Sequence, residues 1–221
     1  MAIEIYWGSG SPFAWRALLA LEVKRLPYES HLIQFSKGEQ REPSYLAMNP
    51  RGKVPTLRDG DYVVYESVAI LGYLDAKYPQ VPLFGTSPEE RGTILRHVAE
   101  TDAYLQPALV TTAQAVFSGQ AKEKAAAVKD AVATIHQELA TVEKSLAKSA
   151  WIAGSAVSAA DLVVFPFVQI LQRAAAKPDA AALDLGLLPL RERYPAIAAW
   201  VGRVEGLPGY ERTYPPHWRE S

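Results

Sequence analysis

The sequence predicts a small α/β domain followed by an all-helical bundle. Three observations support this fold class. The first eighty residues alternate between strand and helix patterns, a stretch rich in proline, glycine and serine follows, and only helical patterns come after it. We therefore expect an α/β domain at residues 1–79, a linker at 80–88 and a helical domain at 89–221.

The strand and helix patterns of the first part are short and well bounded. Residues 3–7 are apolar and β-favouring, and Ser11-Pro12 then starts a helix that runs to about Arg25, because serine is a preferred cap and proline suits the first helical position. A second strand is predicted at 28–35, and a short helical turn at 44–48.

A hairpin and a second helix complete this domain. Residues 54–65 form a hairpin pattern, in which two apolar runs flank Asp59-Gly60, a dipeptide suited to positive φ. Ser67 is expected to cap the helix that follows. The order β, α, β, connection, β, β, α predicts a mixed sheet with helices packed on it.

The second part contains helix signals only. A long helix is predicted from residue 89 to about 117 with a kink at Pro107, and another over residues 122–148. Ser158 starts the next helix, and Asp161 three residues later completes a capping box in which aspartate replaces glutamate. Pro195 begins a further short helix.

Composition and charge exclude several classes of protein. Of the 221 residues, 49% are hydrophobic and 21% charged, which excludes a mainly disordered chain. The net charge is −1, and neither part has the basic excess of a nucleic-acid or anionic-membrane binder. The absence of cysteine excludes disulfides, thiolate metal sites and a cysteine nucleophile. No membrane span or signal peptide is visible, so we predict a cytoplasmic protein.

Two turns that lead into helices contain hydroxyl side chains. At Ser9-Gly10-Ser11-Pro12 the free N–H groups of the helix start favour an anion, to which a hydroxyl can donate. At Glu66-Ser67 the helix start suits a carboxylate and Glu66 suits an ammonium, and an amino-acid head group has both. Taken singly, each turn is better explained as an ordinary helix cap.

Two further features are ambiguous in isolation. The Val54-Pro55 bond is either cis, which would turn the Val54 backbone toward an extended ligand, or an ordinary trans bond that starts a strand. Lys53, with Arg51 nearby, meets an anionic ligand or is simply solvated. The four histidines show no metal-ligand spacing, and no nucleophile elbow, dinucleotide fingerprint or P-loop occurs.

Each of these features is a weak signal alone, but their order along the chain is specific for one protein family. The stretch NPRGKVPTL at 49–57, YESVAILGYLD at 65–75 and SAAD at 158–161, within this sequence of elements, resemble the cytosolic glutathione S-transferases from Ile3 to about Tyr210. The resemblance implies a thioredoxin-like N-terminal domain, an all-helical C-terminal domain and a homodimer. It also implies a detoxifying transferase that takes glutathione as co-substrate and a small electrophilic substrate, with no metal.

The resemblance also implies residue roles in glutathione binding. Pro55 is the cis-proline and the Val54 backbone pairs with the cysteinyl unit. Glu66 and Ser67 hold the γ-glutamyl head, while Lys53 and Gln40 face the glycyl carboxylate.

The thiol-activating residue is implied by the stretch SPFAWRALLAL. It is similar to the serine-type motif of the zeta and theta-like classes, which selects Ser11, with Ser9 as the nearer alternative and Tyr6 as a third. An apolar second-substrate pocket between the domains would be lined by Phe13, Tyr104 and Trp218.

Other activities of such a protein stay open at this point. The zeta-class isomerase signature has serine and cysteine where this chain has Pro12 and Phe13, whereas a glutathione-dependent peroxidase needs only the same activated thiol. Glutathione-transferase-like domains also serve as non-catalytic binding or interaction modules. Such a module would tolerate the loss of Ser11, and the enzyme would not.

Overall fold

The computed structural model describes residues 3–183 and 185–219, which form two compact units. Unit 1 comprises residues up to 83 together with the segment from 206 onward, and unit 2 comprises residues 84–205. The sequence-based division ended the first domain at residue 79 and placed everything from 89 in the helical domain. In the structure the last segment of the chain packs with unit 1.

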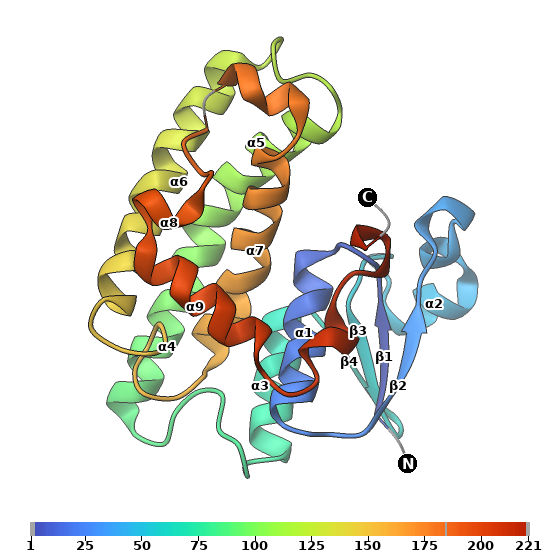
Figure 1. Ribbon diagram of the computed structural model, residues 1–221. Coiled ribbons are helices and arrows are strands. Elements are labelled where there is room, and N and C mark those ends of the chain that lie inside the picture. Colours follow the sequence, from blue (N-terminus) through green and yellow to red (C-terminus); the bar gives the residue numbers. More distant parts are fainter. Residues whose placement is uncertain (1–2, 184, 220–221) are drawn as a thin grey trace. The chain divides into compact units, whose positions relative to one another are not determined.

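Unit 1 is built on a four-stranded mixed sheet. The strands are β1 (Ile3–Trp7), β2 (Tyr28–Leu32), β3 (Thr56–Asp59) and β4 (Tyr62–Tyr65), in the spatial order β2-β1-β3-β4 (Figure 1). β1 pairs in parallel with β2, and the other neighbours are antiparallel. The parallel pair is joined by helix α1 (Pro12–Val23), as parallel strands require a crossover. The predicted thioredoxin-like arrangement is confirmed.

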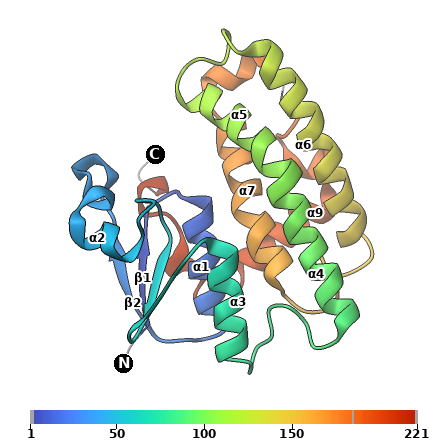
Figure 2. The ribbon, with the colours of Figure 1, turned by 180° about the vertical axis from the view of Figure 1, so that it is seen from behind.

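Helices cover both faces of this sheet. α1 and α3 (Ser67–Lys77) pack against each other on one face, and the short α2 (Pro43–Met48) lies on the other side (Figure 2). Successive side chains of β1 point to opposite faces of the sheet. Ile3, Ile5 and Trp7 are buried on one face, whereas Glu4 and Tyr6 on the other face are half-buried.

Two local predictions in unit 1 were wrong in detail. β2 ends at Leu32, because the chain continues into a 3-10 turn, η1 (Phe35–Lys37), before a second one, η2 (Glu39–Arg41). Ser67 is the first residue of α3, and the N-cap is Glu66. The positive φ of Glu66, 71°, turns the chain from β4 into α3. Ser67 therefore offers its side chain to another partner.

The C-terminal segment of unit 1 contains α10 (Tyr210–Thr213) and η5 (Pro216–Trp218), and it packs on α1. The Trp15 indole N–H donates to Thr213 Oγ1 at 2.8 Å, and the Trp15 ring lies edge-on to Trp218 at 5.4 Å between centroids. Arg212 also forms an ion pair with Glu22 of α1. Aromatic packing and polar contacts thus hold this segment to α1.

Unit 2 is helical in its described residues. Its elements are α4 (Pro88–Glu100), η3 (Thr101–Leu105), α5 (Gln106–Phe117), α6 (Ala125–Leu146), α7 (Ala159–Ala175), η4 (Pro178–Leu183), α8 (Leu190–Arg193) and α9 (Pro195–Glu205). Where a kink was predicted near Pro107, the structure has a π-helical turn, η3, directly before α5. This wider turn accommodates Pro107, which has no N–H to donate to a helical hydrogen bond. Among the described residues no helix is long and apolar enough to span a membrane.

The predicted capping box of α7 is confirmed. The buried Asp161 carboxylate accepts from the Ser158 N–H at 2.9 Å and from the Ser158 hydroxyl at 3.1 Å. The same carboxylate accepts from the Ile152 N–H and from the Trp200 indole, each at 2.9 Å. One side chain therefore joins the start of α7, the loop before it and α9.

Candidate functional site

A tight turn joins β1 to α1 and contains the two candidate serines. The Ser11 N–H donates to the Gly8 carbonyl at 3.1 Å, which closes a β-turn with Ser9 and Gly10 at its centre. Gly10 has a φ of +79°, and a Cβ there would lie 2.7 Å from Cε1 of His217. Glycine is required at this position both for the backbone conformation and for the close approach of the imidazole.

Ser11 is the N-cap of α1, as predicted. Its Oγ accepts a hydrogen bond from the Ala14 N–H at 3.2 Å, and the side chain is half-buried. Within the described residues the Ser11 hydroxyl hydrogen has no acceptor. The hydroxyl can therefore cap the helix and still donate to an anion at the positive end of α1.

Ser9 has a partner that the sequence did not indicate. Its Oγ lies 2.6 Å from Nδ1 of His217, which comes from the C-terminal segment and is exposed at this turn. The pairing spans 208 residues. Neither local spacing nor periodicity could have shown it.

The loop before β3 is held from beneath by buried side chains. The Lys53 carbonyl accepts from the Tyr45 hydroxyl at 2.6 Å and from the Asn49 amide at 2.8 Å, and Asn49 also donates to Thr56 Oγ1 at 3.0 Å. These contacts bracket the Val54–Pro55 peptide bond, which is cis, as the resemblance implies.

The Val54 backbone lies beside the turn of residues 8–11, which we call the serine turn. Within the described residues neither its N–H nor its C=O makes a hydrogen bond, so both remain able to pair with an extended ligand. A Cβ at Gly8 would lie 3.3 Å from Val54 Cγ2, which shows how closely the two segments approach.

Glu66 and Ser67 lie where β4 passes into α3. The Glu66 carboxylate is exposed and accepts from Arg51 Nε at 3.3 Å. Ser67 is buried, and its Oγ accepts from Nη1 of Arg16 at 3.3 Å. Arg16 is a fully buried residue of α1, so a cation lies directly beneath the start of α3.

Lys53 and Gln40 flank this region. The Lys53 side chain is exposed, whereas its carbonyl is held as described above. The backbone oxygen of Gln40 would lie 2.9 Å from a Cβ at Gly52, whose φ is +59°. Gln40 Oε1 is buried without a hydrogen-bond partner in the described chain. The two side chains thus belong to neighbouring loops.

The geometry argues against Tyr6 as the thiol activator. Its hydroxyl donates to Glu4 Oε2 at 2.8 Å, and its ring stacks on His31. Burial, and then the hydrogen bond to Glu4, raise the pKa of Tyr6. A tyrosine committed to a carboxylate in this way is a poor donor to a second anion.

The three second-substrate candidates differ in environment. Phe13 is half-buried at the start of α1, with the Arg16 guanidinium 5.0 Å from its ring centroid. Trp218 is only 8% exposed, because it packs on Trp15 and Tyr214. Tyr104 is 58% exposed on η3 of unit 2.

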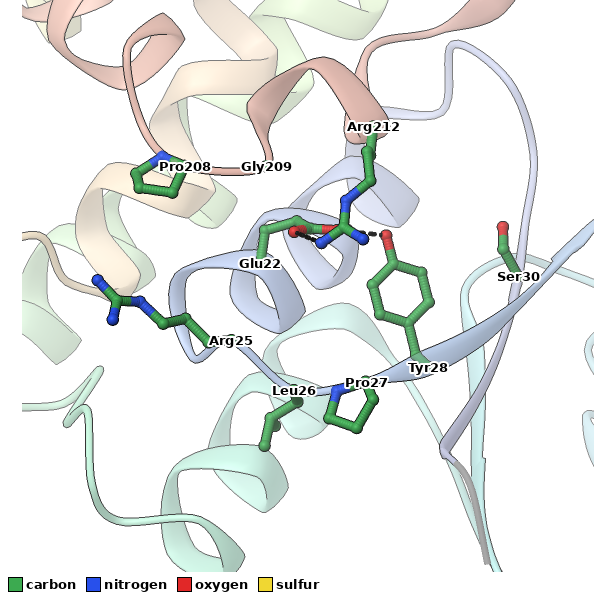
Figure 3. A pocket seen from close by; sticks show the side chains of 9 residues that line it. All are labelled: Glu22, Arg25, Leu26, Pro27, Tyr28, Ser30, Pro208, Gly209 and Arg212. Carbon is green, nitrogen blue, oxygen red and sulfur yellow. Dashed lines mark hydrogen bonds and ion pairs between the residues drawn. The ribbon is translucent and has the colours of Figure 1, made fainter.

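A pocket of about 650 Å³ opens elsewhere in unit 1 (Figure 3). It lies at the C-terminal end of α1, and none of the predicted site residues lines it. Glu22 accepts there from Tyr28 at 2.7 Å and pairs with Arg212, so these polar groups satisfy one another. They serve to hold α10 against α1.

The thioredoxin-like unit and the helical unit define a class of two-domain proteins, and comparisons identify its family. A family model described as the glutathione S-transferase N-terminal domain matches residues 10–77, and one described as its C-terminal domain matches residues 105–208. The chain is 32% identical to glutathione S-transferase A of Pleuronectes platessa, over 99% of this chain and 94% of that protein. It is 39% identical to glutathione S-transferase F10 of Arabidopsis thaliana, over 71% and 75%.

A solved structure agrees with these sequence matches. The glutathione S-transferase of the Antarctic clam Laternula elliptica superposes with a TM-score of 0.86 at 33% identity, over 100% of this chain and 95% of that one. The chain belongs to the glutathione S-transferase family. It is an enzyme of the glutathione transferase type, with glutathione as its co-substrate.

Proposed function

We propose that this transferase activates glutathione with the Ser11 hydroxyl and transfers the thiolate to a small hydrophobic electrophile. One observation carries the proposal: Ser11 caps α1 through its oxygen while its hydrogen stays unengaged within the described residues. Ser9 is the alternative donor on the same turn. This is the serine-type chemistry of the zeta and theta-like classes.

The free energies are sufficient for activation. A free thiol has a pKa of about 8.5, and lowering it by about 2 units needs about 2.7 kcal/mol of thiolate stabilisation. A charge-assisted hydrogen bond contributes about 1.5–3 kcal/mol. The start of α1 adds about 0.3–1 kcal/mol. Together they reach the required stabilisation.

The remaining contacts would bind the tripeptide along unit 1. The free N–H and C=O of Val54 pair with the cysteinyl unit, and Ser67, above the buried Arg16, receives the γ-glutamyl carboxylate. Glu66 receives the ammonium, while Lys53 and Gln40 face the glycyl carboxylate. The three candidate residues Phe13, Tyr104 and Trp218 would contact the second substrate.

The assembly and location of the enzyme follow the family and the composition. We expect a homodimer, which light scattering on the purified protein would show as twice the chain mass. We expect a cytoplasmic protein, because a chain without cysteine fits a reducing compartment. No nucleic-acid or membrane partner is expected.

Calorimetry with glutathione, with thiolate absorbance followed across pH on the same sample, tests the proposed function. Binding with a bound-thiol pKa clearly below the free value is expected. Binding with an unshifted pKa would identify a ligand-holding protein instead. No binding would leave only the fold, and an interaction module would then be the better description.

A further inference from the structure

The exposed imidazole of His217 is an ionisable group that, among the described residues, lies against the serine turn. Its Nδ1 lies 2.6 Å from Ser9 Oγ, and its Cε1 lies where a Cβ of Gly10 would be. The ring is held there because Trp218, the next residue, packs on Trp15 of α1. The activation described above stabilises a thiolate but leaves the destination of the thiol proton open.

We propose that His217 takes up the glutathione thiol proton through the Ser9 hydroxyl. The inference rests on the function proposed above. Ser9 donates its hydroxyl hydrogen to neutral Nδ1 while its oxygen accepts the hydrogen of the thiol. The S–H bond and the Ser9 O–H bond break, a new O–H and a new N–H bond form, and the products are a thiolate and an imidazolium.

The hydrogen bonds between Ser9 and His217 are favourable both before and after the proton transfer. Before it, the neutral imidazole accepts from Ser9. After it, the imidazolium donates to Ser9 Oγ, and the new Ser9 hydroxyl hydrogen points to the thiolate. Ser9 thus becomes a second donor to sulfur, beside Ser11. His217 does not touch the substrate and acts only through Ser9, so it is a positioning residue that also stores a proton.

The charges around the imidazole permit this role. Residues 8–13, which form the turn and the start of α1 against which the ring packs, contain no ionisable side chain. Arg16 of α1 is buried and is directed to Ser67. On the C-terminal segment, Arg219 forms a 2.7 Å ion pair with Glu211, and Tyr214 packs on Trp218. A thiolate at the turn would therefore meet an imidazolium without a competing carboxylate from that turn.

Counting protons tests the inference directly. The experiment titrates the enzyme with glutathione at about pH 7.5, between the ordinary pKa values of histidine and a free thiol, about 6.5 and 8.5. Thiolate formed is measured by its ultraviolet absorbance, and protons released by calorimetry in two buffers of different ionisation enthalpy. We expect close to one thiolate and far less than one proton per site.

Variants separate proton uptake from simple positioning. His217→Gln keeps a hydrogen-bonding group but cannot hold the proton, so each thiolate should release one proton. We also expect kcat/KM near neutral pH to fall at least about tenfold, with the acid limb of the pH profile displaced upward. Ser9→Ala should release the proton in the same way. The matched control is His31→Gln, since His31 of β2 pairs with Glu4 and Glu29, and its proton count should equal that of the wild type.

The outcomes distinguish the proposed role of His217 from the proposed activation of glutathione, on which it depends. Release of a full proton per thiolate by the wild-type enzyme would overturn the role of His217 and leave thiol activation standing. A His217→Gln variant with the wild-type proton count and rate would do the same. If the wild-type enzyme forms no thiolate, the proposed function fails, and this inference fails with it. Because His217 is exposed, its substitution is not expected to unfold the chain.

Discussion

The guanidinium of Arg16 donates to the hydroxyl of Ser67 across 3.3 Å, and so connects the interior of α1 with the first residue of α3. Arg16 is fully buried and Ser67 is 6% exposed. The arrangement places a permanent positive charge beneath the proposed position of the γ-glutamyl carboxylate. A guanidinium at this position would attract an anion bound at the start of α3, in addition to its hydrogen bond to Ser67.

Arg16→Met is therefore expected to weaken glutathione binding. The substitution keeps an unbranched stem and removes the charge, and we expect the Kd to rise about tenfold, equivalent to about 1.4 kcal/mol. Calorimetric titration measures the change. The substitution also removes the hydrogen bond from Arg16 to Ser67, so an unfolding curve on the same sample serves as the control for lost stability. An unchanged Kd in a folded variant would contradict the proposed role.

Ser11→Ala is expected to reduce turnover rather than binding. Loss of the hydroxyl removes a hydrogen bond that acts mainly on the thiolate, so kcat should fall about 100-fold while glutathione affinity changes little. The variant also loses a helix cap, which costs about 1 kcal/mol of stability. Steady-state kinetics with a model electrophile measures the effect.

Ser158→Ala is the matched control for Ser11→Ala. It removes the cap of α7 at a similar cost in stability and leaves the serine turn intact. Its turnover should equal that of the wild-type enzyme. If Ser11→Ala keeps full turnover, the activating role passes to Ser9.

Asp161→Asn is expected to destabilise unit 2 strongly. The carboxylate accepts four hydrogen bonds, and asparagine offers one acceptor oxygen and sets an NH₂ group against the other donors. We expect the free energy of unfolding to fall by about 3 kcal/mol, from urea denaturation. A loss no greater than that of Ser158→Ala would show that the cap alone matters.

Acid stability should depend on Glu4 and Arg58. The hydrogen bond from Arg58 is the main cause that holds the pKa of Glu4 below 4.5, its ordinary value. A depressed carboxyl pKa contributes stability above the unfolded-state pKa, and this contribution is lost as the pH falls through the folded-state pKa. Arg58→Met should therefore be less stable than the wild type at neutral pH, and the difference should shrink below about pH 4.

Urea denaturation across pH measures this difference. Arg41→Met provides the comparison, since Arg41 is exposed and has no ion pair in the described chain. It should show a difference that does not vary with pH in this range. A constant Arg58→Met difference would rule out Glu4 as the titrating group.

Sequence patterns predicted the features that depend on nearby residues. Three features depend only on residues close together in the sequence, so their spacing predicted them. They are the Ser11 cap, the hairpin at 54–65 and the Ser158–Asp161 capping box. The start of α3 was misassigned because a left-handed φ at Glu66 is not visible from residue type, and Glu66 rather than Ser67 proved to be the cap.

Contacts between distant residues were missed for a physical reason. The Ser9–His217 and Arg16–Ser67 pairs arise from packing of elements far apart in the sequence, and no local periodicity encodes them. The His217 imidazole showed no signal in the sequence, because its partner is a single hydroxyl 208 positions earlier. From the C-terminal segment the sequence analysis named Trp218 as a candidate, but not its neighbour His217, which contacts Ser9.

The contact between Trp15 and Thr213, 198 positions apart, also sets an order of events during synthesis. Helix α1 is not fully buried until residues 213–218, which come much later in the chain, have been translated. A nascent chain that has reached only the end of α9 exposes the indole of Trp15 to chaperones and to other chains. Unit 1 is therefore completed only after the whole of unit 2 has been synthesised.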